Sequence, residues 1–436
     1  KGEMGGDCLN AGCVPSKTLI ASAAVAHAMR NAATYGVHPT EPRVEWTAIR
    51  KRIARTIEEI APVDSQARYQ AMGVRVIRAA ARFVDRSTVE AGGFSVRARR
   101  FVIATGSSPA APPIPGLDSI RYLTNETIFA LDTLPQRLLV LGAGPIGLEL
   151  AQAFRRLGSE VVVLEKDRAL ANEDIELAQV AIDALRREGV DLQEKVEIKR
   201  VEFHGDGVRI VLAGANMERF VDGSHLLVAA GRRPNVFNLG LEAAGVSFGA
   251  QGIATSAGLR TSNRRIYAVG DVAGRGQFTH LASQHAEIVL REILFRKRSA
   301  AQPPPRVTFT DPEIAWAGLS ENEARKRHRD IRVLRRAFAD NDRAQAEGAG
   351  EGHIKAITTR DGHVVGCGIV GRRAGELIGP WSLAISQRMR AQDIARAVAP
   401  YPTLSEISRR AAAGVYAGLP ENPRVRGLVR FLRRFG

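Results

Sequence analysis

The sequence predicts an α/β protein of several domains, and three observations lead to this fold class. A chain of 436 residues is too long for one hydrophobic core and divides into about two to four domains. Residues 138–165 read as strand, glycine turn, helix and strand, which is a βαβ unit. The proline-rich stretch SAAQPPPRV at 299–307 separates this region from a segment of short strands and late helices, which predicts a mixed α+β domain.

The elements around the βαβ unit follow from local patterns. Alanine-rich helical spacing runs through residues 18–80, and apolar and polar residues then alternate around Gly92–Gly93, which predicts a hairpin leading into a strand. SSPAAPPIPG at 107–116 can continue neither a helix nor a strand, so it marks the crossing to the next unit. A long helix at 173–188 and a strand that enters a glycine turn at 264–274 are also predicted.

The composition argues against two classes of function. The net charge is +16, but the excess arginine is scattered and aromatic residues make up only 6%, whereas nucleic-acid binders concentrate charge and interleave aromatic side chains. The longest apolar run, Leu138–Phe154, contains three glycines, a proline and a glutamate, so it does not read as a membrane span. Three cysteines in so long a chain argue against a secreted disulfide framework, and no signal peptide is visible. We therefore expect a cytoplasmic protein that binds no nucleic acid and attracts anionic small molecules.

A glycine motif predicts a dinucleotide site. Gly142, Gly144 and Gly147 form G-x-G-x-x-G between a predicted strand and a predicted helix. Such glycines let the backbone approach a pyrophosphate, whose charge lies at the positive N-terminus of the helix. Glu165 ends the next strand, where its carboxylate can accept hydrogen bonds from a ribose 2′-hydroxyl and would repel a 2′-phosphate. NADH is therefore favoured over NADPH, although basic residues after Glu165 weaken the preference. A glycine turn that only packs a helix on a strand is the alternative.

The stretch GGDCLNAGCVPSK holds two of the three cysteines, Cys8 and Cys13. On a regular helix their Cα atoms would lie about 7.5 Å apart, whereas a disulfide requires less than about 7 Å. Gly12 permits a distorted turn and Pro15 removes an intrahelical donor, so the segment can accommodate a disulfide. No histidine lies within ten residues of Cys13 and Cys367 is distant in sequence, which argues against a zinc site. We favour a redox pair over a metal site or two inert buried thiols.

Seven motifs, in order, resemble the pyridine nucleotide–disulfide oxidoreductases, the family of dihydrolipoamide dehydrogenase, glutathione reductase and mercuric reductase. They are GGDCLNAGCVPSK, VIATGSSP, VLGAGPIGLELA, AAGRRPN, IYAVGDVAG, TFTDPEIAWAG and YPTLSE, and they extend over nearly the whole chain. The resemblance implies two doubly wound, Rossmann-like domains for FAD and NAD(P) and an α+β C-terminal dimerisation domain. We expect FAD-binding segments at 1–122 and 242–303, an NAD(P)-binding domain at 123–241, a dimerisation domain at 304–420 and a basic tail at 421–436. The family's first FAD-binding βαβ unit would precede the cysteine motif, so we expect it to be missing from this chain.

The resemblance also implies a path for electrons. NADH, bound at the glycine motif and Glu165, would pass a hydride to FAD, and the flavin would reduce a Cys8–Cys13 disulfide that in turn reduces a small-molecule acceptor. Cys13 would be the thiolate that lies against the flavin, and Cys8 the thiol that meets the substrate. Lys17 and Glu149 match the ion pair beside the flavin, where the lysine charge favours electron-rich flavin and a thiolate, and the carboxylate keeps the lysine protonated.

The other cofactor contacts that the resemblance implies lie at glycine-rich turns. They are Gly5, Gly6, Thr105, Gly106, Gly231, Gly270 and Asp271. Asp271 would hold the ribityl chain of FAD, and turn stabilisation is the alternative for it. An inert surface ion pair is the alternative for Lys17 and Glu149. No metal ligand is implied.

Two positions depart from the family. Dihydrolipoamide dehydrogenase and glutathione reductase place a catalytic histidine before proline and a glutamate after it, whereas PYPTLSE has Tyr401 at the histidine position and Glu406 at the glutamate. Tyrosine, with an ordinary pKa of about 10, is a poor base at neutral pH, and losing a positioned base costs about 10²–10⁴-fold in proton-transfer steps. Asp7, where the family often has threonine, should discourage a thiolate at Cys8. We expect Cys367 to be a small buried residue.

The departures lead to one preferred function and two alternatives. Mercuric reductase also has a tyrosine in this neighbourhood, although its C-terminal cysteine pair has no counterpart in the closing residues RGLVRFLRRFG. We therefore expect a mercuric-reductase-like enzyme, with dihydrolipoamide dehydrogenase lacking its histidine and a non-catalytic redox-sensing flavoprotein as alternatives. In the family the histidine–glutamate segment reaches the partner subunit's cysteines, so Tyr401 and Glu406 imply an obligate homodimer.

The last residues predict a basic amphipathic helix. Its apolar face has arginines around it and consists of Val425, Leu428, Val429, Leu432 and Phe435. A helix of this kind can lie on an anionic membrane, but we favour docking on the protein's own surface.

Overall fold

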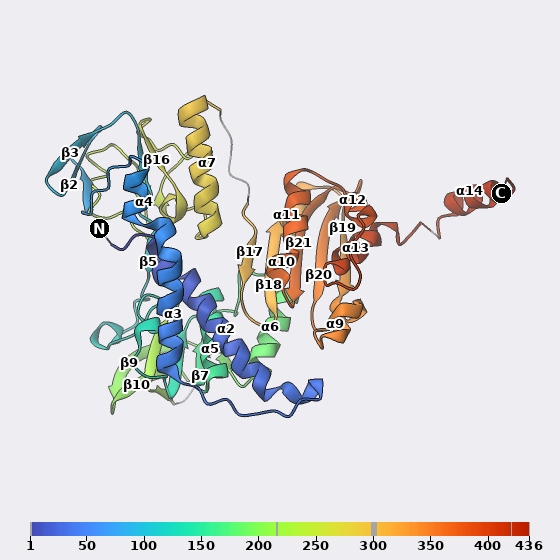
Figure 1. The fold of residues 1–436 in the computed structure, drawn as a ribbon, viewed down its shortest axis with the longest axis horizontal. Helices are drawn as coiled ribbons and strands as arrows, with labels where there is room; N and C mark the ends of the chain where they lie inside the picture. The colour runs from blue at the N-terminus through green and yellow to red at the C-terminus, as the bar shows by residue number, and fades with distance from the viewer. Residues whose placement is uncertain (1, 215–216, 298–302, 420, 436) are drawn as a thin grey trace. The chain divides into compact units, whose positions relative to one another are not determined.

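The computed structural model describes residues 2–214, 217–297, 303–419 and 421–435. The chain forms two compact units, one of residues 1–170 with 186–302 and one of residues 171–185 with 303–436. Their elements are shown in Figure 1. Residues 299–302 of the predicted linker lie outside the described residues. The mixture of helices and strands confirms the predicted α/β class, whereas the finer domain division stays a prediction.

A parallel sheet forms the centre of the predicted dinucleotide region in the first unit. Its four strands run in the order β12 (His225–Val228), β6 (Arg137–Leu141), β7 (Glu160–Leu164) and β8 (Asp191–Gln193). Helix α5 (Pro145–Leu157) connects β6 to β7, so the predicted βαβ unit is present. After Arg137, strand β6 consists of four apolar residues, all of them buried, as expected of a parallel strand covered on both faces.

A second, antiparallel sheet packs against this one. It contains β9 (Ile198–His204), β10 (Gly207–Leu212) and β11 (Arg219–Gly223). Residues of β6 and β7 share one buried apolar cluster with residues of β9, β10 and β11. This cluster covers one face of the parallel sheet.

The rest of the first unit contains the cysteine helices and short paired strands. Helices α1 (Gly6–Asn10), α2 (Cys13–Arg30), α3 (Trp46–Ile60) and α4 (Gln66–Ala71) come first, and α2 packs against α3 and α5. The predicted hairpin is β2 (Thr88–Ala91) and β3 (Phe94–Arg97), which turns at Gly92–Gly93 and pairs with β1 (Ala81–Phe83). Strands β4 (Phe101–Ile103) and β16 (Ile266–Ala268) pair in parallel, β5 (Ser107–Pro109) pairs with β13 (Arg232–Pro234), β14 (Phe248–Gly249) pairs with β15 (Gly252–Ile253), and α7 (Thr279–Phe295) follows.

The second unit is built on an antiparallel sheet. Its five strands run in the order β17 (Arg306–Thr308), β18 (Glu313–Gly318), β21 (Val364–Gly371), β20 (His353–Thr359) and β19 (Ile331–Ala337). Its helices are α6 (Ile175–Arg187, of which residues 175–185 belong to this unit), α8 (Glu321–Arg327), α9 (Asp342–Ala346), α10 (Ala374–Leu377), α11 (Gly379–Ser386), α12 (Ala391–Arg396), α13 (Glu406–Ala413) and α14 (Pro423–Leu432).

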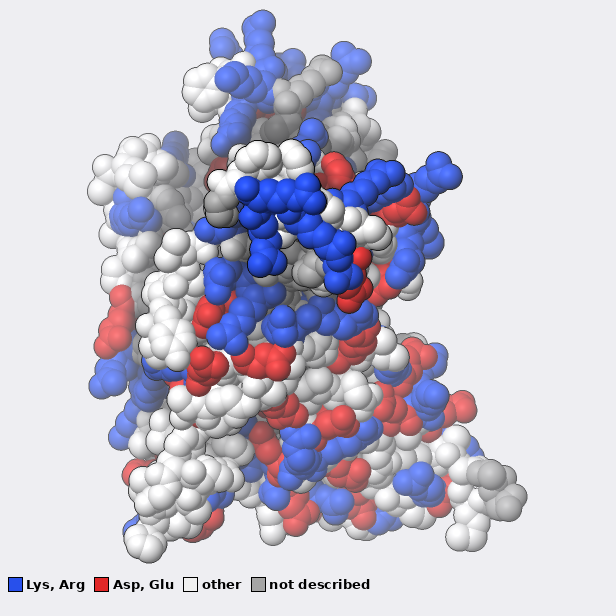
Figure 2. Space-filling model, turned by 90° about the vertical axis from the view of Figure 1, so that its right-hand side faces the viewer, with Lys and Arg blue, Asp and Glu red and all other residues white. Residues whose placement is uncertain are grey.

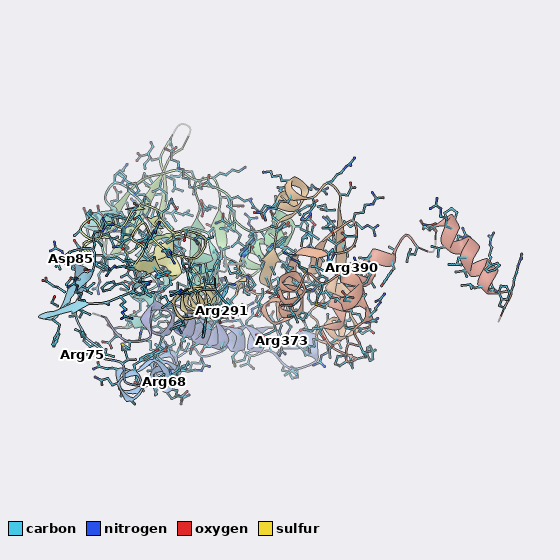
Figure 3. All side chains as sticks on the ribbon, turned by 90° about the horizontal axis from the view of Figure 1, so that it is seen from above. Arg68, Arg75, Asp85, Arg291, Arg373 and Arg390 are labelled. Atoms are coloured by element: carbon cyan, nitrogen blue, oxygen red, sulfur yellow. The ribbon has the colours of Figure 1, made fainter. Side chains whose placement is uncertain are left out.

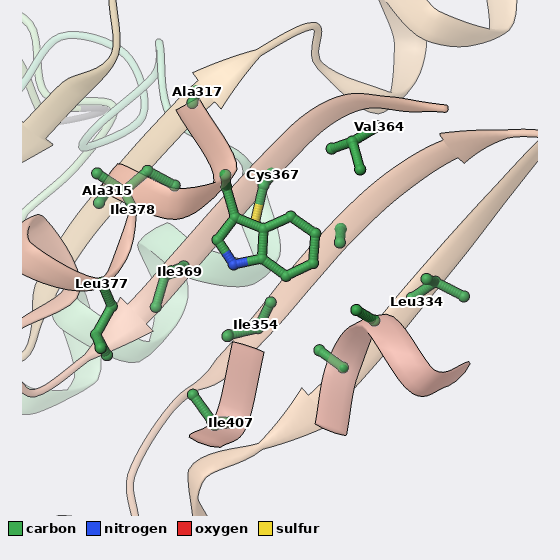
Figure 4. Close-up of a cluster of buried hydrophobic side chains, with 14 of the residues drawn as sticks. Ala315, Ala317, Leu334, Ile354, Val364, Cys367, Ile369, Leu377, Ile378 and Ile407 are labelled. Carbon is green, nitrogen blue, oxygen red and sulfur yellow. The ribbon is translucent and has the colours of Figure 1, made fainter. Parts of the chain in front are cut away.

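Two features hold this sheet to its helices. The thiol of Cys367 is fully buried in an apolar cluster with Ile369 and Ile407, which confirms the predicted buried cysteine (Figure 4). A Cβ at Gly368 would lie 2.4 Å from Leu177 of α6, so only glycine lets that helix approach the strand this closely. Cys367 therefore serves the packing of this domain and is not a candidate redox group.

Arginine side chains occur on both units. Figure 3 labels arginines of the first unit, Arg68, Arg75 and Arg291, and of the second unit, Arg373 and Arg390. Within the described residues, no helix combines the length and the apolar character that crossing a membrane requires.

The predicted amphipathic helix at the C-terminal end forms as α14. None of its residues is buried, and Figures 1 and 3 both draw it with no other element of its unit beside it. Our preference for docking on the protein's own surface is therefore wrong for the described part of the second unit.

Candidate functional site

The cysteine segment is a helix interrupted between its two thiols. Ala11, with φ −143°, ends α1, and Gly12, with φ −119° and ψ −106°, precedes α2, so Cys8 and Cys13 do not share one helix. A Cβ at Gly12 would lie 3.0 Å from the carbonyl oxygen of Asp7, which requires the backbones to approach closely there. The distortion that the sequence analysis required is present, and it brings the two thiols close enough for each to shift the pKa of the other. Both cysteines are reduced in this structure.

The two thiols differ in acidity. The hydrogen bond from Cys8 lowers the pKa of Cys13 to about 6, and the Thr279 hydroxyl and the charge of Lys17 act in the same direction. The same hydrogen bond with Cys13, together with burial, raises the pKa of Cys8. One proton therefore resides on Cys8 while Cys13 is the thiolate near neutral pH, which is the assignment that the resemblance implies.

Thr279 is a residue of this site that the sequence analysis missed. Its Oγ1 lies 3.6 Å from the sulfur of Cys13. Thr279 is the first residue of α7, a helix of 17 residues, and the N-terminus of a helix favours a negative charge. No local sequence signal could reveal it, because 266 residues separate the two partners.

Lys17 and Glu149 form the predicted ion pair. Lys17 Nζ lies 2.7 Å from Glu149 Oε2. The pair forms because α2, which carries Lys17, packs against α5, which carries Glu149. The glutamate side chain is only 7% exposed, so removing the lysine would leave a buried carboxylate without its cation.

An arginine ties the cysteine segment to the predicted flavin-binding turns. Arg232 is largely buried, and its Nη2 lies 3.2 Å from Asp7 Oδ2. The same guanidinium donates to Ser107 Oγ at 2.8 Å, and Ser107 Oγ donates to Asp271 Oδ2 at 2.6 Å. Our expectation that Asp7 discourages a thiolate at Cys8 needs correction: Arg232 compensates the Asp7 charge, and the raised pKa of Cys8 comes from Cys13 and from burial.

Asn125 holds the segment between the cysteines. Its Nδ2 donates to Asp7 Oδ1 at 3.3 Å and to the carbonyl oxygen of Ala11 at 3.2 Å, and its Oδ1 accepts from Arg232 at 3.3 Å. Sequence reasoning singled out the motif AAGRRPN but not Arg232 within it, and it gave no signal for Asn125. Both residues act through contacts that span more than a hundred positions.

The described residues fit the flavin side of an FAD. Strands β4 and β16 run in parallel, which brings Thr105–Gly106 and Gly270–Asp271 to the same carboxyl edge. A Cβ at Gly106 or at Gly6 would meet no atom within 4 Å, so the space in front of these backbones is open. Ser107 orients the Asp271 carboxylate through Oδ2, which allows Oδ1 to accept a hydroxyl of a ribityl chain.

Two further groups support these turns. Gly5, with φ 89°, adopts a left-handed conformation before α1, and a Cβ there would collide with Leu9. The N–H of Gly270 donates to Nδ1 of His285 at 3.1 Å, and this imidazole is fully buried in α7. His285 is a further residue that the sequence analysis missed.

The glycine motif also fits a pyrophosphate. A Cβ at Gly142 would lie 2.6 Å from the Ala229 carbonyl oxygen, and one at Gly147 would lie 2.0 Å from that of Gly142, so both glycines are required by packing. A Cβ at Gly144 would meet nothing within 4 Å, which leaves the N-terminus of α5 open to an anion. Gly231, with φ 136°, likewise has open space before it.

Glu165 lies where its carboxylate could bind the ribose of a dinucleotide. It follows β7, and its Oε2 accepts from the N–H of Ala143, inside the glycine motif, at 2.7 Å. Its Oε1 accepts from the N–H of Asp167 at 3.0 Å. These bonds fix the carboxylate beside the motif while each oxygen keeps a second lone pair for a ribose hydroxyl.

Tyr401 and Glu406 lie in the second unit, whereas the cysteines lie in the first. Tyr401 is 69% exposed, and a hydrogen bond to Asp342 raises its pKa, so the phenol stays protonated at neutral pH. Glu406 is buried and pairs with Arg410 at 3.1 Å and Arg409 at 3.6 Å. The chain therefore provides a phenol and a neutralised carboxylate where the family has a histidine–glutamate couple.

The comparisons with known proteins agree with these motifs. The family described as pyridine nucleotide-disulphide oxidoreductase matches residues 2–286, and its dimerisation domain matches residues 304–412. Mercuric reductase of Bacillus cereus is 33% identical over 93% of this chain, and the chain spans 65% of that relative's length. Mercuric reductase of Streptomyces lividans is 33% identical, with 94% of this chain and 89% of the relative covered. Dihydrolipoyl dehydrogenase of Pseudomonas aeruginosa is 36% identical with the same coverage of both chains.

Solved structures show the same fold. LpdA of Mycobacterium tuberculosis superposes with a TM-score of 0.87 at 29% identity, over 95% of this chain and 92% of its own. The HOCl-induced flavoprotein disulfide reductase RclA of Escherichia coli superposes with a TM-score of 0.83 at 24% identity, over 94% and 91%, and this likeness shows the fold alone. The chain belongs to the pyridine nucleotide–disulfide oxidoreductases, a family of flavoenzymes that use FAD and NAD(P)H.

Proposed function

We propose that this protein passes electrons from NAD(P)H, through FAD, to the Cys8–Cys13 pair and on to a small acceptor, in the manner of mercuric reductase. The observation that carries the proposal is the unequal acidity of the two thiols, with the pKa of Cys13 lowered to about 6 and that of Cys8 raised. Two electrons and one proton convert a disulfide into one thiolate and one thiol, and these residues stabilise that product.

The chain's own residues would hold both cofactors. Thr105–Gly106 and Gly270–Asp271 would bind the flavin side of FAD, which when bound supplies the two-electron relay between NAD(P)H and the cysteines. The glycine motif would bind the pyrophosphate of the nicotinamide cofactor, with Glu165 favouring NADH. Lys17, Thr279 and Cys8 stabilise the negative charge on the sulfur of Cys13. Cys8 remains a protonated thiol, and it must lose this proton before its sulfur can bind an electrophile.

The side chains of Tyr401 and Glu406 in the second unit indicate what kind of acceptor is favoured. Tyr401 is already protonated at neutral pH, because a hydrogen bond to Asp342 raises its pKa, so it cannot act as a base there. Glu406 is engaged in ion pairs with Arg410 and Arg409. An acceptor that needs no acid–base residue is therefore favoured over lipoamide, and thiolates are good ligands for soft metal ions. In a homodimer, which the dimerisation domain supports, Tyr401 would serve the partner's cysteines as a donor or guide.

Steady-state assays test this function. Full-length protein with FAD and NADH is offered Hg(II), lipoamide, glutathione disulfide or a quinone, and NADH oxidation is followed by absorbance. We expect turnover with Hg(II) or another small electrophile, and its loss in Cys13→Ala. Fast turnover with lipoamide would contradict the preferred acceptor, and absence of turnover with every acceptor would favour the redox sensor.

A further inference from the structure

Helix α14 separates its apolar and basic residues on opposite faces. At about 100° per residue, Val425, Leu428, Val429 and Leu432 of α14 fall within one third of the helix circumference, and Phe435 follows three residues after the helix ends. Arg426 and Arg430 fall on the opposite side, Arg424 borders the apolar face, and Arg433 and Arg434 follow the end of the helix. Phe431 borders the apolar face and its ring contacts that of Phe435 edge to face at 5.1 Å.

The apolar face of α14 is uncovered by its own unit. Leu428 is 57% exposed and Phe435 is 76% exposed. The dimerisation domain shared with the family matches residues up to 412, so α14 lies beyond it. Exposing these apolar side chains to water is unfavourable, so we expect a partner that covers them.

The charge on α14 indicates what kind of partner it is. Residues 422–435 contain five arginines and no acidic residue. Figure 2 views this end of the chain and shows lysine and arginine side chains gathered on the face toward the viewer. A nucleic-acid backbone would complement the arginines but not five apolar side chains, whereas an anionic bilayer offers charged headgroups and a hydrocarbon boundary together.

We propose that α14 binds the surface of an anionic lipid bilayer, lying in the interface with Leu428 and Leu432 toward the acyl chains and its arginines among the headgroups. The helix has 10 residues and is too short to span, so the protein would be held on the membrane rather than through it. This attachment goes beyond the proposed redox function and needs none of its residues.

Vesicle flotation with the full chain tests the proposal. The probes are large unilamellar vesicles of phosphatidylcholine alone and of phosphatidylcholine with about one third phosphatidylglycerol. We expect partitioning onto the anionic vesicles at 100 mM salt, little onto the neutral ones, and a steep decrease as salt rises. In the double variant Arg426→Glu/Arg430→Glu the partition coefficient should fall at least about 25-fold, since each arginine near such a surface contributes about fivefold.

Matched variants separate attachment from general effects of charge and polarity. The partition coefficient of Leu428→Glu/Leu432→Glu should fall by at least about tenfold, because burial of the apolar face is lost. The controls are Arg55→Glu/Arg360→Glu, whose side chains are 71% and 81% exposed, and Phe203→Glu, which is 66% exposed. Both controls should float like the unmodified protein, and all variants should keep its thermal melting temperature.

Three results would overturn the proposal. One is failure of the unmodified protein to float with anionic vesicles. Another is equal flotation of the α14 variants and the controls. The third is a smaller oligomer for Leu428→Glu/Leu432→Glu by light scattering without any vesicle binding, which would make a second copy of the chain the occupant of this face.

Discussion

Cys8 sets the acidity of Cys13, and replacing it predicts a measurable shift. In Cys8→Ala the thiol that donates to Cys13 is lost, so the pKa of Cys13 should rise above its present value of about 6. In Cys8→Ser a hydroxyl donor remains, so the pKa should stay close to about 6. The two variants differ by one oxygen atom and form a matched pair.

The magnitude follows from the hydrogen bond. A hydrogen bond to a charged group contributes about 1.5–3 kcal/mol, and each pKa unit corresponds to about 1.4 kcal/mol. Cys13 is exposed, so solvent screens the interaction and we take the lower end, a rise of about one unit. At pH 7 the thiolate fraction would then fall from about nine-tenths to about one-half, and at pH 5 it would fall about tenfold.

The assay is the rate of iodoacetamide alkylation of reduced protein against pH, read by mass spectrometry of the peptide that contains Cys13. The thiolate reacts, so the rate is low below the pKa and rises through it, and the midpoint reports that pKa. We expect midpoints of about 6 for the unmodified protein and about 7 for Cys8→Ala. Identical midpoints in Cys8→Ala and the unmodified protein would refute the account of the hydrogen bond.

Three further predictions concern the cofactor, the acceptor and stability. Gly144→Val should fill the open space before α5, so calorimetry should show a higher dissociation constant for NADH at an unchanged melting temperature. Gly147→Val should lower the melting temperature, because its Cβ would meet a carbonyl oxygen at 2.0 Å. Equal melting temperatures of the two variants would contradict the packing argument. Tyr401→His restores a base near neutral pH and should raise NAD⁺ reduction by dihydrolipoamide by about 10²-fold or more, and no increase would show that the base is not what is missing. Lys355→Met should cost about 3–5 kcal/mol in urea unfolding, because Lys355 is 3% exposed and pairs with three carboxylates, and a loss below about 1 kcal/mol would place the network in the range of surface pairs.

Local signals explain what the sequence could predict. The uninterrupted apolar strand before Gly142 and the glycine spacing after it determine the βαβ unit without help from distant residues. Gly12 could be assigned to a distorted turn because two thiols five positions apart cannot pair on a regular helix. Lys17 and Glu149 were found only through the family motifs, since nothing local relates residues 132 positions apart.

What the sequence could not predict depends on tertiary contacts. Thr279 and Asn125 carry no local pattern, and each becomes a site residue only when separate segments meet at Cys13 and Asp7. The role of Asp7 was misjudged because its charge was considered without Arg232, which lies in another part of the chain. For α14, periodicity predicts an amphipathic helix but contains no information on what covers it.

The bridging amide of Asn125 has a mechanical consequence. One side chain holds both the Asp7 carboxylate, which precedes Cys8, and the carbonyl oxygen of Ala11, which precedes Cys13. The backbone between the two sulfurs is therefore restrained in the reduced state of this structure. Opening and closing the S–S bond is left to rotation about the cysteine side-chain torsions. Each redox cycle would then require little rearrangement of the backbone.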